Sequence, residues 1–285
     1  MKTTANIYTF RARSVVTLSI ASIISAYCFL WPFFLNAHSS AHHLNNQIFS
    51  IVGVPLALAV LIVDISNDRL DAKSVALLGV LAALTAALRP LGAGAVGIEP
   101  MWFILILSAR VFGPAFGFIL GILSMFVSAF ITGGFGPWLA YQMFAAGWVG
   151  LGAGLIPQRI GGREVRGRIE IAVLAIYGIF AALLFGLLMD LQFWPWGLGS
   201  HTQLSYVPGA SIATNAHRFL IYHFASSMAW DVPRAFVTSV LTIITAPAVL
   251  FAMRRTKRRA SFQTPIEFRA SEATLIARAK EQTEV

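Results

Sequence analysis

The chain has 285 residues, of which 57% are hydrophobic and only 12% are charged. This composition is typical of a membrane protein and argues against a water-soluble monomer. The formal net charge is +9, but the cations are scattered over short polar segments and the C-terminal end, so we do not expect a nucleic-acid-binding protein. Cys28 is the only cysteine, which excludes a disulfide framework and a cysteine-based metal site within the chain.

Eight apolar runs are predicted to form transmembrane helices, since most have close to the roughly 20 residues that cross a hydrocarbon core. They cover residues 14–35, 47–65, 73–91, 100–112, 114–132, 137–157, 169–190 and 234–254. The predicted fold class is therefore all-α, a polytopic membrane helical bundle.

The Lys and Arg residues decide how the short run 100–112 is interpreted. With eight spans and a cytoplasmic N-terminus, 18 of the 21 Lys and Arg fall on the cytoplasmic side, and only Arg89, Arg218 and Arg234 lie outside. Merging this run with the next would place the cations between residues 159 and 168 and those after residue 254 outside. Because cations are enriched in cytoplasmic loops, we predict eight separate spans with both termini in the cytoplasm.

Residues 1–72 are predicted to form a two-helix membrane segment. The first run could be a secretory signal, but its apolar stretch exceeds the usual length of about 7 to 15 residues, so we interpret it as a retained anchor. The loop after it contains His38, His42 and His43 but no nearby carboxylate or cysteine. We interpret this loop as a polar connector and predict neither a metal site nor a cofactor.

Residues 73–254 are predicted to form a six-helix substrate-binding core, and residues 255–285 a basic cytoplasmic tail. Small residues recur at four-residue spacing in three of the core runs, which allows close approach of helix backbones. These rows are Gly79, Ala83 and Ala87 beside Ala82 and Ala86; Gly113, Gly117 and Gly121; and Gly150 and Gly154. From the sequence alone, each row could pack inside this fold or against another chain.

Three connections on the predicted outer side carry the candidate substrate-binding residues. The longest, between Asp190 and Arg234, is rich in aromatic residues and contains no Lys. A connection of that length is usually functional or disordered, and its aromatic content is poorly suited to disorder. We therefore predict that it folds over a small-molecule pocket. The predicted substrate-binding residues are Arg89, Glu99, Trp138, Tyr141, Gln142, Asp190, Trp194, Trp196, His201, Tyr206, Asn215, His217, Arg218 and Trp230. An interfacial aromatic belt is the alternative explanation for Trp31, Trp102 and Trp138.

The few outer charges allow specific pairings to be predicted. Asp231 and Arg234 stand three residues apart across a helix start and can pair with each other. Arg89 and Glu99 flank the first outer turn and could pair in the same way. Arg218 is the better ligand candidate because no acid lies near it in the sequence.

Enzyme motifs are absent from the sequence. It contains no P-loop, HExxH or GxSxG pattern. We therefore expect a non-enzymatic protein that draws any energy it needs from a gradient or a partner.

Several segments resemble the substrate-specific S component of energy-coupling factor (ECF) transporters, in a form found in actinobacteria. They are ALRPLGAGAVGIEP (87–100), ARVFGPAFGFILGILS (109–124), TGGFGPWLAYQM (132–143) and GWVGLGAGLIP (147–157), with WDVPRAF and RRTKRR near the end of the core. The resemblance implies a subunit of the bacterial plasma membrane that captures a vitamin or related micronutrient outside the cell. It also implies partners, namely a transmembrane coupling subunit and two ABC ATPases.

The resemblance further implies that an AxxxA face, matched here by Ala82 and Ala86 with Ala83 and Ala87 adjacent, packs against the coupling subunit. The two N-terminal helices depart from the six-helix pattern of the family. An aromatic, weakly charged pocket suits a large flat cofactor precursor, and cobalamin is the substrate expected within the family. Two alternatives remain: a stand-alone secondary transporter, for which broken helices in corresponding halves are missing, and a scaffold protein without a small ligand.

Overall fold

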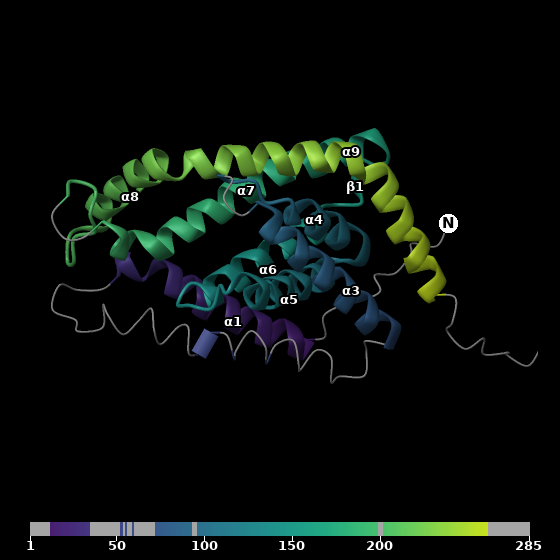
Figure 1. Cartoon of the computed structure of the whole chain (residues 1–285), viewed down its shortest axis with the longest axis horizontal. Coiled ribbons are helices and arrows are strands. Elements are labelled where there is room, and N and C mark those ends of the chain that lie inside the picture. The colour runs from purple at the N-terminus through teal and green to yellow at the C-terminus, as the bar shows by residue number, and fades with distance from the viewer. Residues whose placement is uncertain are drawn as a thin grey trace, which may run out of the picture.

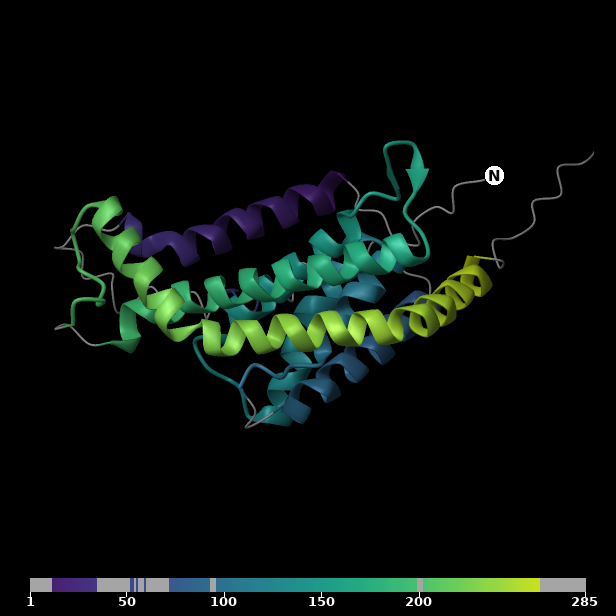
Figure 2. The same cartoon turned by 90° about the horizontal axis from the view of Figure 1, so that it is seen from above.

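The computed structural model describes residues 12–34, 72–92, 96–198 and 202–261, together with positions 52, 53, 55 and 59. These residues form an elongated bundle of α-helices (Figures 1 and 2). The helices are α1 (Ala12–Leu30), α3 (Ala72–Leu88), α4 (Met101–Phe112), α5 (Pro114–Thr132), α6 (Leu139–Leu155), α7 (Arg168–Gly197), α8 (Ile212–Ser226) and α9 (Met228–Ser261). Two short 3₁₀ turns, η1 (Trp31–Phe33) and η2 (Arg89–Gly92), follow α1 and α3. The helical class predicted from the sequence is confirmed for this part of the chain.

Four of these helices are long and apolar enough to cross a membrane: Lys73–Gly92, Pro114–Thr132, Arg168–Gly197 and Met228–Arg258. Leu18–Phe33 and Met101–Phe112 are shorter apolar helices. Large apolar side chains such as Val80, Phe180 and Phe236 are exposed on the outside of the bundle, where hydrocarbon chains would cover them. The predicted run 47–65 lies almost entirely outside the described residues, so the count of eight crossings stays a prediction.

The chain reverses direction between α4 and α5. Gly113 has a φ of 106°, and a side chain at Gly117 would clash with Ala109. In one continuous helix these two residues would lie about 12 Å apart along the axis. The prediction that 100–112 and 114–132 form separate helices is therefore confirmed.

Glycine rows bring α5 and α6 into close contact. A Cβ atom at Gly117 would overlap the backbone of Gly150, one at Gly121 would overlap the backbone of Ala146, and one at Gly154 would overlap Pro114. The two rows predicted in these helices thus face each other inside the fold, which is the arrangement that lets backbones meet without intervening side chains.

The long connection between Asp190 and Arg234 is more ordered than the sequence suggested. Helix α7 continues to Gly197, α8 occupies residues 212–226, and α9 begins at Met228. At 30 residues, α7 is about 45 Å long and exceeds the hydrocarbon thickness of about 30 Å. An untilted helix of this length extends beyond the hydrocarbon core at one or both of its ends. At the other end, α9 continues past the predicted boundary at residue 254.

A short hairpin, which the sequence did not predict, joins α6 to α7. Strands β1 (Arg159–Ile160) and β2 (Arg163–Glu164) pair antiparallel. Gly161 and Gly162 both have positive φ values, as a two-residue turn between twisted strands requires. The hairpin and the end of α9 lie at the end of the bundle opposite α8 (Figure 1). We call these the inner end and the outer end, following the predicted topology.

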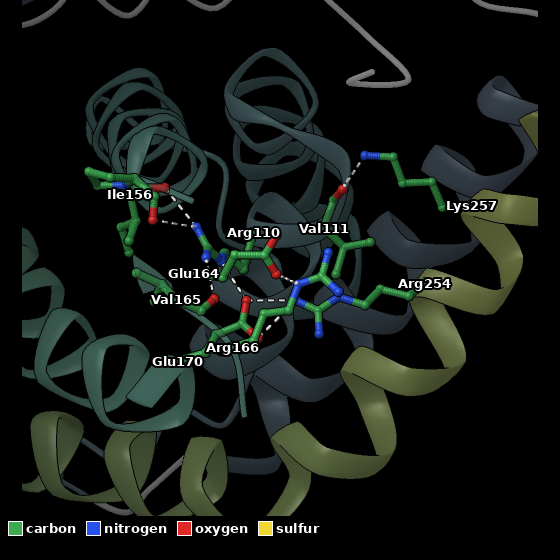
Figure 3. A network of polar contacts seen from close by, with 10 residues as sticks. Arg110, Val111, Ile156, Glu164, Val165, Arg166, Glu170, Arg254 and Lys257 are labelled. Atoms are coloured by element: carbon green, nitrogen blue, oxygen red, sulfur yellow. Dashed lines mark hydrogen bonds and ion pairs between the residues drawn. The ribbon is translucent and has the colours of Figure 1, made fainter. Parts of the chain in front are cut away.

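A buried network of charges ties the helices together at the inner end (Figure 3). The Arg110 Nε atom lies 2.7 Å from a carboxylate oxygen of Glu170, and both side chains are almost fully buried. Arg254 binds the same carboxylate at 2.6 Å, while Lys257 donates to the Val111 carbonyl at 2.8 Å. The remaining Arg110 donors bind the Ile156, Pro157 and Val165 carbonyls around the hairpin. Glu170 thus joins α4, α7 and α9 in one ionic contact.

Candidate functional site

The candidate site lies at the outer end, where the predicted binding residues of three connections meet. Residues near the end of α3 contact residues of α5 and α6, and the segment before α4 contacts the start of α9. The end of α7 contacts α8. Segments more than 100 residues apart in the sequence, such as those of Glu99 and Arg234, thus become neighbours here.

Arg234 is the centre of the outer charge cluster. Its Nη1 atom lies 2.6 Å from Asp231 and its Nε atom 2.8 Å from Glu99, while its guanidinium stands 5.3 Å from the centroid of the Phe185 ring. Trp102 donates to the same Glu99 carboxylate at 2.7 Å. The predicted pairing of Asp231 with Arg234 is confirmed. The hydrogen bonds of Arg89 and Glu99 go to other partners: Arg89 donates to Ser128 and Gln142, and Glu99 is bound by Arg234 and Trp102.

Asp231 is buried because two neighbours make room for it and bind it. The Ser227 hydroxyl donates to its carboxylate at 2.7 Å. On α7, Gly186 has no side chain where a Cβ atom would overlap that carboxylate. A charged group out of water needs such partners to avoid a large desolvation cost, so Gly186 and Ser227 both help to accommodate the carboxylate that pairs with Arg234.

A cavity of about 260 Å³ lies beside this cluster, between α7, α8 and α9. It is lined by Gly186, Met189, Asp190, Phe193, Tyr222, Ser226, Ser227, Trp230, Asp231 and Arg234. The Asp190 carboxylate lies 2.8 Å from the His223 Nδ1 atom, which attaches α8 to α7. Burial and the nearby Asp190 carboxylate raise the pKa of Tyr222, so its hydroxyl stays protonated at neutral pH and can donate or accept a hydrogen bond.

The cavity has more acidic than basic lining groups. Its lining includes two acids, Asp190 and Asp231, and one cation, Arg234. The Arg234 guanidinium is already bound by the carboxylates of Asp231 and Glu99. Aromatic side chains of Phe193, Tyr222 and Trp230 provide apolar walls. Such a site suits a ligand with a flat ring and hydroxyl groups, and no lining cation is left over for an anionic group.

Arg89 forms a second polar contact at the outer end. It donates to the Ser128 hydroxyl at 2.8 Å and to the Gln142 amide oxygen at 3.0 Å. The contact joins the end of α3 to α5 and α6, and it brings together two of the predicted substrate-binding residues, Arg89 and Gln142.

Three of the predicted aromatic residues, Trp194, Trp196 and Tyr206, belong to one cluster of packed rings. We use the name aromatic cap for Trp31, Phe33, Trp194, Trp196, Tyr206 and Phe219, whose rings lie next to one another. Trp194 is fully buried and donates to the Leu204 carbonyl at 2.7 Å. The chain itself therefore fills the space between these rings, and the cavity lies beside the cap.

The structure places the remaining predicted residues as follows. Arg218 donates to the Gln203 and Ser205 carbonyls, and Asn215 exchanges hydrogen bonds with the Val207 backbone, so both hold the segment before α8. Tyr141 is buried and donates to the Cys28 carbonyl. Trp138 and His217 are exposed, and His201 lies outside the described residues. Among the predicted residues, Asp190 and Trp230 line the cavity.

Several lining residues were missed at the level of sequence. Tyr222 and Ser226 lie four residues apart on α8, and Ser227 stands three and four residues before Trp230 and Asp231, which the sequence had already singled out. This spacing places them on one helix face. It could have identified them, had these segments been recognised as helices.

These features define a multi-pass helical membrane protein with a candidate small-molecule site between α7, α8 and α9. A sequence model of the family "ECF-type riboflavin transporter, S component" matches residues 69–223. The chain belongs to this family, which confirms the resemblance to an ECF S component. No curated protein and no solved structure matches the chain.

Family membership establishes the general role of the chain. S components are membrane-embedded transport subunits that bind small molecules and work with a coupling subunit and ATPases. The match begins just before α3 and ends within α8, so α1 and α9 lie outside it.

Proposed function

We propose that this chain captures riboflavin, or a closely related uncharged flavin, at its outer end and delivers it to an ECF-type import complex. The observation that carries the proposal is the cavity between α7, α8 and α9, with aromatic walls and several hydrogen-bonding groups, in a chain whose family is named for riboflavin. An isoalloxazine ring can stack on aromatic side chains, and its ribityl hydroxyls can donate to carboxylates.

Riboflavin fits the size of the site better than the cobalamin expected from the sequence. The corrin ring and nucleotide tail of cobalamin occupy several times the cavity volume of about 260 Å³. A flavin is a far smaller molecule, so a smaller outward movement of α8 would admit it.

Flavin fluorescence tests the substrate directly. The purified chain in detergent is titrated with riboflavin, and we expect saturable quenching as the ring stacks on the cavity walls. Cobalamin serves as a competitor and is expected not to displace riboflavin. Absence of saturable riboflavin quenching would contradict the proposed substrate.

We further propose that the exposed row on α3 contacts the coupling subunit. Gly79, Ala83 and Ala87 are exposed, whereas Ala82 and Ala86 are buried against the chain's own helices. Of the two adjacent rows that the sequence offers, only the first leaves a small-residue surface on which a partner backbone could pack.

Substitution on this face tests the partner. Ala83→Leu is expected to abolish copurification of the coupling subunit and ATPases from the native host while riboflavin binding is retained. Leu84→Trp, a control that adds more bulk at an exposed position about 100° around α3 from Ala83, should retain the partners. Equal recovery of partners with both variants would contradict this surface. Riboflavin uptake by the chain alone in vesicles would instead support a stand-alone transporter.

A further inference from the structure

Helix α1 lies outside the region that matches the family, yet it is firmly attached to the core. Along its length, the Trp148 Nε1 atom donates to the Ser22 hydroxyl at 3.1 Å, and the Tyr141 hydroxyl donates to the Cys28 carbonyl at 3.3 Å. Phe29 is buried against Tyr141, with ring centroids 4.8 Å apart. Figure 2 shows α1 running beside α7, with its outer end close to the segment that carries α8.

The turn η1, at the outer end of α1, contributes two rings to the aromatic cap. Trp31 is only 1% exposed and lies between Trp196 and Tyr206, with both ring centroids at 5.6 Å. Phe33 stacks on Trp194 at 6.3 Å and meets the edge of Phe219 at 6.4 Å. Two aromatic residues of the 3₁₀ turn η1, which directly follows α1, thus contact the end of α7, the segment before α8, and α8 itself.

From the cap, an unbroken series of contacts leads to the cavity. The Phe219 ring stacks on His223 at 5.9 Å, and His223 in turn binds Asp190 at 2.8 Å. Phe219 and His223 are on the same helix as Tyr222 and Ser226, which line the cavity. A shift of Phe219 would therefore move a whole wall of the candidate site.

Helix α8 has few other attachments that could hold it. It has 15 residues, and much of its apolar surface, including Ile212, Leu220 and Phe224, is exposed. An isolated helix of this length is only marginally stable, so its position depends on the contacts made by Phe219, His223 and Asn215.

We propose that Trp31 and Phe33 are positioning residues of the substrate site. They act through the aromatic cap, holding α8 in the position in which Tyr222 and Ser226 face Asp190 and Asp231. The added N-terminal helix thus controls how long the substrate is retained. This inference rests on the proposed function of the cavity, but its effect on α8 can be measured without any ligand.

The test compares two double variants of the full-length chain in detergent. The first is Trp31→Ala with Phe33→Ala; the control is Ile23→Ala with Tyr27→Ala, on the face of α1 where these side chains are 68% and 53% exposed. Hydrogen–deuterium exchange is followed in peptides covering residues 204–226 and in peptides from α5 and α6. The dissociation rate of riboflavin is measured by fluorescence.

We expect the first variant to accelerate exchange in residues 204–226 and riboflavin dissociation by about tenfold each, as a local opening would, with α5 and α6 unchanged. The control should match the wild type. Trp31→Phe, which keeps an aromatic ring, should have exchange and dissociation rates close to those of the wild type. Unchanged exchange in residues 204–226 would overturn the inference. It would also fail if exchange rose equally in α5 and α6, or if exchange rose without faster dissociation. If the wild type does not bind riboflavin, the proposed substrate fails, and the exchange comparison alone decides whether α1 holds α8.

Discussion

At the scale of single residues, the outer end shows how charges are retained close to a membrane. Asp231 is buried and accepts from both Ser227 and Arg234. Arg234 also binds Glu99, whose sequence position gave no sign of this partner. Each buried charge has an opposite charge or a hydroxyl within hydrogen-bonding distance, as low-dielectric surroundings require.

Gly186 provides the most specific residue-scale test. A Cβ atom here would overlap the Asp231 carboxylate, so Gly186→Ala is expected to lower the free energy of unfolding by about 1 to 3 kcal/mol and to weaken riboflavin binding. Thermal unfolding and flavin titration of the purified chain measure both effects. Gly79→Ala is the matched control, because a Cβ atom there meets nothing within 4 Å. Equal behaviour of the two variants would show that Gly186 is not needed to accommodate Asp231.

The acidic lining predicts discrimination against phosphorylated flavins. With Asp190 and Asp231 facing the cavity and Arg234 already paired, a phosphate would meet like charges in poorly solvated surroundings. We expect flavin mononucleotide to bind at least about tenfold more weakly than riboflavin, a difference of roughly 1.4 kcal/mol. Competition titrations give this ratio. Asp190→Asn should reduce it, and Glu164→Gln at the inner end should leave it unchanged. A ratio unaffected by Asp190→Asn would mean that this carboxylate does not face the ligand.

At the scale of elements, each end of the bundle is fastened by contacts between helix termini. The inner network joins α4, α7 and α9 through Glu170, and Arg110 also binds the carbonyls around the hairpin. At the outer end, the Asp190–His223 and Glu99–Arg234 contacts join α7 to α8 and the start of α4 to α9. Such contacts fix the helix ends without restricting the apolar middle of the bundle.

Removal of the Glu170 charge tests the inner network. Glu170→Gln leaves two arginines without a carboxylate, so we expect a loss of about 3 to 5 kcal/mol, as for other broken buried ion pairs. Glu164→Gln, which breaks exposed contacts to Arg159 and Arg166, should cost less than about 1 kcal/mol. Denaturation of both variants in detergent provides the comparison. Similar small losses would show that the Glu170 contacts are readily replaced by water.

The sequence predicted some elements better than others. The α4–α5 reversal was indicated by the cation distribution, because the positive-inside bias distinguishes one crossing from two. Helix α8 was missed, because its mixture of aromatic, polar and histidine residues forms no apolar run. Ser211, which caps α8 by accepting from the Thr214 backbone N–H, is a helix start signal that could have indicated it.

At the scale of the whole molecule, the two ends differ in chemistry. The inner end gathers arginines and a lysine around Glu170, and the outer end gathers aromatic residues and acids. This separation matches the predicted orientation, in which the cationic end faces the cytoplasm and the substrate site faces outward.

Cysteine labelling tests this orientation, and the chain is well suited to it. Its single cysteine, Cys28, is buried, so the wild type provides a low background. Ser211→Cys at the outer end is expected to react with a membrane-impermeant maleimide in intact cells. Ile160→Cys in the exposed hairpin should react only after permeabilisation. The reverse pattern would contradict an outward-facing site.

The candidate site was only partly predictable. Asp190 and Trp230 were identified from their place in an aromatic outer connection, and the Asp231–Arg234 pair from its helical spacing. The partners Glu99, Gly186 and His223 come from other elements, and no local pattern reports a contact across 33 or 135 residues. Arg218 was predicted as a ligand candidate because no acid lies near it in the sequence. In the fold it donates to the Gln203 and Ser205 carbonyls, which no local pattern indicated.

By itself, the sequence determined the class of protein and the separate apolar helices of the core, and it predicts the sidedness of the charges, because hydrophobic length and cation bias act locally along the chain. Only the tertiary structure decided which small-residue row stays exposed on α3, that α1 reaches into the aromatic cap, and which acids line the cavity. These features depend on which helix faces meet, and that is set by packing and by the pairing of buried charges over long sequence separations.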